Sequence, residues 1–82
     1  MYWELRTVPH ADLVGESEDL DALLRLARGC LDAGFPLDDL YICAEWDEHE
    51  ARDHADLPAI ISGAELVVRA QAADTSRQTA PT

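Results

Sequence analysis

The sequence predicts an α+β fold in which a small, mainly antiparallel sheet of three to four strands packs against a main helix, with a second C-terminal helix. Two stretches alternate apolar and polar residues with the period of a strand, and a leucine-rich stretch between them has the period of a helix. Short connections rich in proline, glycine and aspartate separate these stretches. The expected order of elements is β-β-α-β-(β)-α.

The first strand is expected at residues 2–8, YWELRTV, where large side chains alternate between two faces. Pro9 cannot extend a strand ladder and Asp12 suits a turn, so the chain is expected to reverse direction there. The next stretch, LVGE at residues 13–16, is therefore expected to pair back on the first strand as a hairpin.

The main helix is expected at residues 19–33. Its charged residues form one polar stripe and leave the rest of the circumference apolar; they are Asp21, Arg25, Arg28 and Asp32. Ser17 or Asp19 can cap the N-terminal end. Gly34 is expected to end the helix in the left-handed conformation, with Phe35 closing a hydrophobic contact.

A second central strand is expected at residues 40–46, LYICAEW, because its apolar residues alternate cleanly. Residues 47–56 are strongly polar and are expected to form a loop. The following LPAII stretch, residues 57–61, predicts a short edge strand, since Pro58 excludes it from the centre of a sheet.

The C-terminal helix is expected to open on a capping box formed by Ser62 and Glu65 and to run for about ten residues. A chain of 82 residues is long enough for one small domain, which we expect to span residues 1–73. The remaining residues, 74–82, are polar and aperiodic and are expected to be a disordered tail.

The composition restricts the partners. Seventeen acidic residues stand against six arginines, and there is no lysine, which gives a net charge of −11. This charge repels phosphates, so neither nucleic acid nor an anionic membrane is expected to bind. The sequence has no signal-peptide pattern and no apolar run of membrane-spanning length. Cys30 and Cys43 match no metal or redox motif, and together these features predict a cytoplasmic protein.

The stretch HEARDH, residues 49–54, differs by one position from the zinc motif HExxH. In a helix it would spread four candidate metal ligands over one side, namely His49, Glu50, Asp53 and His54. Such a helix would have only two alanines as apolar anchors, and a strand would put the two histidines on opposite faces. We therefore expect a solvated loop here, with no metal ion and no other cofactor.

Catalytic motifs are also missing from the sequence. None of the serines lies in a GxSxG turn, and the four glycines form neither a P-loop nor a GxGxxG turn. The paired acids are explained by turns and helix starts. We therefore expect the chain not to be an enzyme.

One face of the expected sheet has the composition of an interface. Alternation along residues 2–8 and 40–46 separates an apolar face from one that mixes aromatic and charged side chains, namely Tyr2, Glu4, Arg6, Tyr41 and Glu45. These five residues are the predicted interaction surface. The alternative is that the second helix covers this face.

The order LVGES, a leucine-rich helix, DDLYI, and SGAEL followed by an alanine-rich helix resembles small acidic proteins of unknown role from high-GC bacteria. The resemblance covers most of residues 2–73. It implies a similar compact α+β fold and implies no activity and no functional residue.

Three functions follow as hypotheses. The first is a non-catalytic cytoplasmic interaction or accessory protein that binds another protein, or itself as a homodimer, through the sheet face. The second is an acidic inhibitor of a basic protein, such as an immunity protein, an antitoxin or a nucleic-acid mimic, and the charge of −11 motivates it. The third is a small metal-dependent hydrolase that uses the HEARDH residues.

Overall fold

An antiparallel sheet and its helices make up the part of the chain that the computed structural model describes, which is the backbone of residues 1–79 and the side chains of residues 1–73. The predicted fold class is confirmed. In chain order the elements are β1 (Tyr2–Thr7), β2 (Leu13–Ser17), α1 (Leu20–Asp32), a 3-10 turn (Leu37–Asp39), β3 (Leu40–Glu45), α2 (Glu48–Asp53), β4 (Ile60–Ser62) and α3 (Gly63–Thr79).

The strands lie in the order β2-β1-β3-β4, and each neighbouring pair is antiparallel. The two longest strands, β1 and β3, pair along their whole length at the centre of the sheet. The predicted hairpin of β1 and β2 is confirmed. The short fourth strand is also confirmed as an edge strand, although it begins after Pro58, at Ile60, rather than at Leu57.

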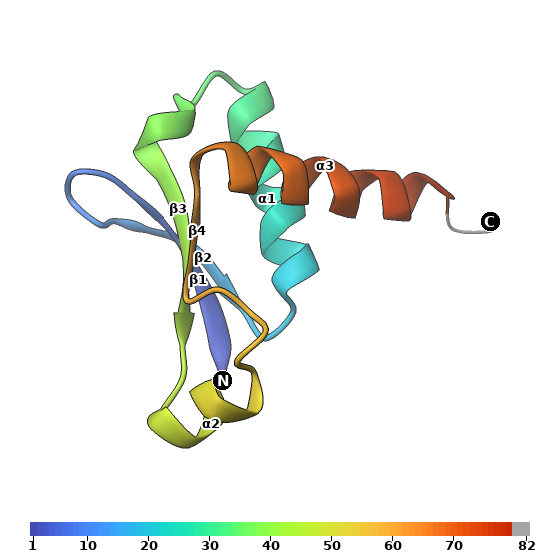
Figure 1. Cartoon of the computed structure of the whole chain (residues 1–82). Coiled ribbons are helices and arrows are strands. Elements are labelled where there is room, and N and C mark those ends of the chain that lie inside the picture. The colour runs from blue at the N-terminus through green and yellow to red at the C-terminus, as the bar shows by residue number, and fades with distance from the viewer. Residues whose placement is uncertain (80–82) are drawn as a thin grey trace.

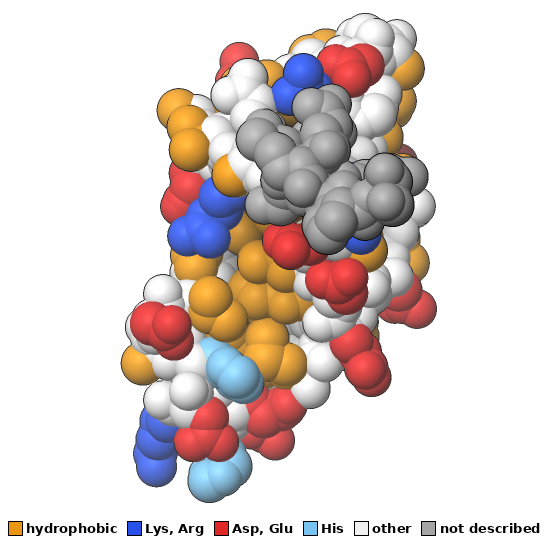
Figure 2. All heavy atoms as spheres, turned by 90° about the vertical axis from the view of Figure 1, so that its right-hand side faces the viewer, with side chains coloured by type: hydrophobic (Ala, Val, Ile, Leu, Met, Phe, Trp, Pro, Cys, Tyr) orange, Lys and Arg blue, Asp and Glu red, His pale blue; other side chains and the backbone are white. Residues whose placement is uncertain are grey.

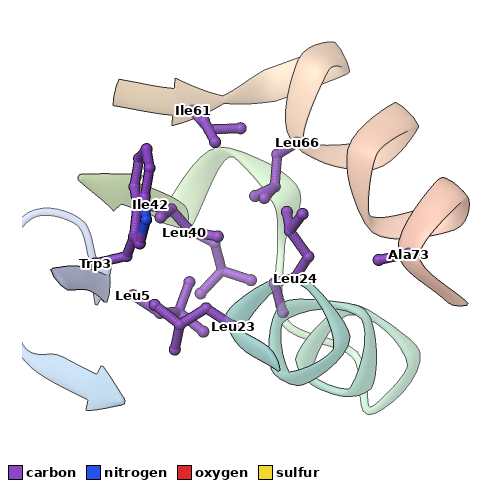
Figure 3. Packing of buried hydrophobic residues seen from close by; sticks show 10 residues of the cluster. Trp3, Leu5, Leu23, Leu24, Leu40, Ile42, Ile61, Leu66 and Ala73 are labelled. Atoms are coloured by element: carbon purple, nitrogen blue, oxygen red, sulfur yellow. The ribbon is translucent and has the colours of Figure 1, made fainter. Parts of the chain in front are cut away.

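Both long helices cover the same face of the sheet (Figure 1). The core lies between this face and the helices, and Figure 3 shows its side chains meeting there. The core residues are Trp3, Leu5, Leu23, Leu24, Ala27, Leu40, Ile42, Ile61, Leu66 and Ala73. Strand β2 packs closely against α1 at Gly15. A Cβ atom at this position would lie only 2.7 Å from Cδ2 of Leu26, so only glycine fits there without a shift of the leucine side chain. Within residues 1–79, no helix covers the opposite face of the sheet.

Helix α1 has the ends that the sequence predicts. The side chain of Asp19 accepts a hydrogen bond of 3.0 Å from the backbone N–H of Asp21, which caps the first turn. At the other end Gly34 has φ +104°, and the backbone N–H of Phe35 donates to the carbonyl of Cys30 over 3.0 Å. This positive φ explains the need for glycine there.

The two glycines of this region make a matched pair for mutagenesis. Gly34→Ala is expected to lower the free energy of unfolding by about 1 to 2 kcal/mol, because a Cβ atom is strained at positive φ. Gly29→Ala lies inside α1 with no atom within 4 Å of the added Cβ, so it is expected to raise stability by up to about 1 kcal/mol. Urea denaturation followed by circular dichroism measures both. Equal effects of the two substitutions would contradict this explanation of the helix end.

Helix α2 corrects the prediction of a loop at residues 47–56. Asp47 and Glu50 form a reciprocal capping box, in which each side chain accepts a hydrogen bond from the other residue's backbone N–H. Contacts with distant residues then hold the helix: the Met1 ammonium group forms an ion pair with Glu50, and the ring of His54 stacks on Trp46. The alanines are therefore not needed as anchors.

Helix α3 is longer than expected. It starts at Gly63, directly after β4, and its backbone stays helical to Thr79, past the expected domain boundary at Ala73. The expected tail is thus helical over residues 74–79, and residues 80–82 lie outside the described residues. Glu65 and Arg69, four positions apart on α3, form an ion pair with 3.6 Å between their charged atoms.

Candidate functional site on the open face of the sheet

The sheet face without a helix, called the open face below, consists of the strand residues that alternate with the core residues. Across β1 and β3 the register pairs Tyr2 with Glu45, Glu4 with Cys43 and Arg6 with Tyr41. The five residues of the predicted interaction surface therefore lie together on the open face. The alternative, that the second helix covers them, is wrong, because α3 packs beside α1 on the other face.

Glu4 and Arg6 form the centre of the open face. They lie two positions apart on β1, so their side chains point to the same side. The Arg6 guanidinium donates three hydrogen bonds to the Glu4 carboxylate, at 3.0, 3.1 and 3.2 Å, and a further one to the carbonyl of Ala11 in the β1–β2 turn. Only 6% of Glu4 is exposed, so this ion pair lies largely out of water.

Carboxylates outnumber cations on the open face. Glu4 raises the pKa of Glu45, first through a hydrogen bond between the two carboxyl groups and then, with partial burial, through its charge. Glu4 also raises the pKa of Tyr2, with help from burial, Glu45 and Glu16. Glu16 joins this group because it lies opposite Glu4 on β2. The open face thus carries three carboxylates, those of Glu4, Glu16 and Glu45, and one guanidinium, that of Arg6, which is already bound to Glu4.

Three side chains of the open face could approach a metal ion. Ligand atoms of Glu4, Cys43 and Glu45 lie within 4.8 Å of one another, and no other such trio occurs among the described residues. A metal ion would need the thiolate of Cys43, but burial raises the pKa of this thiol, and Glu45 and Glu4 raise it further. The carboxylate of Glu4 is also already bound to the guanidinium of Arg6. The arrangement therefore suits a hydrogen-bonding cation, such as a guanidinium or an ammonium group, better than a metal ion.

A shallow hollow of about 480 Å³ lies at the β2 side of the open face. Its lining includes Tyr2, Glu16 and Glu18, so two carboxylates flank an aromatic ring. A cation over the face of an aromatic ring gains attraction from its electrons, and carboxylates add charge-assisted hydrogen bonds. The hollow can therefore accept a lysine or arginine side chain of another molecule.

The HEARDH residues do not come together as a metal site. Nε2 of His49 lies 3.6 Å from Oδ2 of Asp53 on the solvent side of α2, whereas Glu50 binds the Met1 ammonium group. His54 stacks on Trp46, with 6.4 Å between the ring centres. Within the part of the chain that the structure describes, none of the four belongs to a trio of nearby ligand atoms.

Several members of the open face were missed from the sequence. Glu16 lies opposite Glu4, the exposed Leu13 lies opposite Arg6, and Ile60, which is largely exposed, lies opposite Cys43. Alternation along LVGES would have placed Glu16 on this face once the hairpin register was fixed. Ile60 gave no such signal, because its strand has only three residues.

Comparison with protein-family models, with curated proteins and with solved structures finds no match to this chain. The helices in the described part of the chain all fall short of the length and apolar character that crossing a membrane requires. Any functional argument therefore depends on the geometry of the open face itself.

Proposed function

We propose that the chain is a non-catalytic interaction protein whose open face binds a basic partner protein. The observation that carries this proposal is the excess of carboxylates on an ordered sheet face that α1 and α3 leave open, where Glu4, Glu16 and Glu45 stand against the single guanidinium of Arg6. Tyr2 and Tyr41 add aromatic contact area at low entropic cost, as is typical of interfaces. Arginine or lysine side chains of the partner would bind Glu45 and the hollow beside Tyr2.

A basic partner is better supported than a second copy of the chain. Two open faces brought together would place their excess carboxylates against each other, and each chain carries a net charge of −11. The same charge opposes binding of nucleic acid and anionic membranes. We propose a cytoplasmic location, which the two unpaired cysteines, Cys30 and Cys43, support.

An acidic inhibitor, such as an immunity protein, an antitoxin or a nucleic-acid mimic, is the second candidate. It is a special case of the same function, in which binding blocks the activity of the basic partner. The specific observation in its favour is that the carboxylates of the open face are held by a sheet, because a mimic needs charges at fixed spacing. No observation favours a metal-dependent hydrolase.

The proposal is tested by removing the aromatic side chains of the open face. We expect Tyr2→Ser with Tyr41→Ser to weaken capture of a basic protein from a lysate of the source cells by about tenfold or more, because truncated interface aromatics cost the most binding energy. The matched control is Phe35→Ser, an exposed aromatic residue beyond α1 and outside the open face. The captured protein is identified by mass spectrometry, and its affinity is measured at two salt concentrations.

The outcomes separate clearly. Loss of binding in the tyrosine variant, with retention in Phe35→Ser and weakening by salt, would support the proposal. Equal capture by both variants, or a captured protein that is not basic, would contradict it. Salt-insensitive dimers in a native mass spectrum would restore self-association as the function of the face.

A further inference from the structure

A second hollow lies on the helix-covered side of the molecule, where the end of the sheet meets the start of α1 and the end of α2. It has a volume of about 490 Å³. Figure 2 shows hydrophobic side chains gathered at the middle of this side, with acidic side chains along one flank and a histidine on the other. The centre of the open face lies on the other side of the sheet, and Glu18, which follows β2, lines both this hollow and the one beside Tyr2.

The apolar part of this hollow is built by the aromatic cluster at the end of the sheet. Trp3 and Trp46 pack edge to face with 5.7 Å between ring centres, and the ring of His54 stacks on Trp46. Trp3, Leu20, His54 and Leu57 all line the hollow. Both leucines are only partly buried, which leaves apolar surface open to water.

The rim of the hollow is acidic. Glu18, Asp19 and Asp21 line it. Met1 also lines it, but its ammonium group is paired with Glu50. Asp19 is engaged as the cap of α1, whereas the exposed side chains of Glu18 and Asp21 carry charge toward solvent. An apolar floor with an acidic rim is complementary to a ligand that joins an apolar group to cationic groups.

A second, smaller hollow of about 190 Å³ adjoins this one toward α3 and shares Leu20 and Asp21 with it. Leu24, Ala72 and Ala73 also line it, as does Arg69, whose charge is paired with Glu65. Two adjoining hollows on one side of α1 suit an elongated occupant, such as a peptide segment, better than a single ion or a compact metabolite.

We propose that these joined hollows bind a peptide segment of a partner protein, which inserts an apolar side chain between Leu20 and Leu57 and directs lysine or arginine side chains at Glu18 and Asp21. The inference goes beyond the function proposed for the open face, because Leu20, Asp21 and Leu57 line only this hollow and only Glu18 is shared with the hollow beside Tyr2. A chain with both surfaces can hold two basic partners, or two parts of one partner, at once.

The test uses the full chain and a short synthetic peptide that carries one tryptophan between two pairs of arginines. Binding is measured by fluorescence anisotropy at low ionic strength, and it is located by NMR shifts of the backbone amides and the Trp3 indole N–H. We expect the shifts to concentrate at Leu20, Leu57 and the Trp3 indole. A peptide with serine in place of tryptophan is expected to bind about tenfold more weakly, because it lacks the apolar anchor.

Charge variants of the protein complete the test. Asp21→Asn removes a rim charge that the open face does not share and keeps the Asp19 cap, and it is expected to weaken peptide binding about threefold. Asp38→Asn removes the same net charge from an exposed position outside the hollow and is expected to have little effect. The proposal would be overturned by equal weakening in the two variants, by equal binding of the serine peptide, or by shifts confined to Tyr41 and Cys43 on the open face. The tyrosine variant of the open face should still show the shifts at Leu20, Leu57 and the Trp3 indole N–H.

Discussion

Replacement of Leu66 by alanine is expected to lower the free energy of unfolding by about 2 to 5 kcal/mol. Leu66 is the largest fully buried side chain of α3, and it packs beside Ile61 against the helix-covered face of the sheet. A chain of this length has a total stability on the order of 4 to 12 kcal/mol, so this loss is a large part of it. Urea unfolding followed by the fluorescence of buried Trp3 and its neighbour Trp46 measures the change.

The matched control for this prediction is Val68→Ala in the same helix. The side chain of Val68 is 64% exposed, so its truncation is expected to change stability by no more than about 0.5 kcal/mol. If both substitutions were equally mild, α3 would not be docked on this face. The open face could then be covered by α3, and the proposed function would lose its main support.

Local patterns of the sequence were sufficient to predict the strands and the main helix. Alternation in YWELRT and LYICAE separates the core side from the open side, and the register of β1 with β3 then brings the five predicted residues together. The ends of α1 were also predicted, because Asp19 and Gly34 act through their own backbone neighbours. These features depend on contacts between residues close in sequence or on a strict period of two.

Features that depend on distant contacts were not predictable in the same way. Helix α2 is held by the ion pair of Glu50 with Met1 and by the stacking of His54 on Trp46. No local pattern in EHEARD predicts either contact. The periodicity of α3 shows that Leu66, Ala70 and Ala73 share a side, but it does not say which face of the sheet they cover. The charge imbalance of the open face became visible only when the register placed Glu16 opposite Glu4.

Removal of the Arg6 side chain is expected to destabilise the fold by about 3 kcal/mol at neutral pH. Arg6→Ala leaves the Glu4 carboxylate buried without its cation, and breaking a buried ion pair from one side costs about 3 to 5 kcal/mol. The lower end applies because the side chain of Arg6 is 29% exposed. The exposed pair of Arg52 and Glu48 gives the control, since Arg52→Ala is expected to cost less than about 1 kcal/mol.

The effect of Arg6→Ala should depend on pH in a defined direction. The Glu4 carboxylate raises the pKa of Glu45 above its usual value of 4.5, and the charge of Arg6 opposes this rise, so loss of Arg6 raises the pKa further. The folded variant then binds more protons than the unfolded chain above pH 4.5, and its stability falls as the pH rises through the raised pKa of Glu45.

The deficit in unfolding free energy of Arg6→Ala relative to the original protein should therefore shrink as the pH is lowered toward 4.5. Glu4→Gln added to Arg6→Ala should restore stability at neutral pH. Two results would contradict this explanation: a loss of unfolding free energy that does not depend on pH, or one no greater than that of Arg52→Ala. Either result would show that the carboxylates do not repel one another. The argument that the open face attracts a cationic partner would then lose its basis.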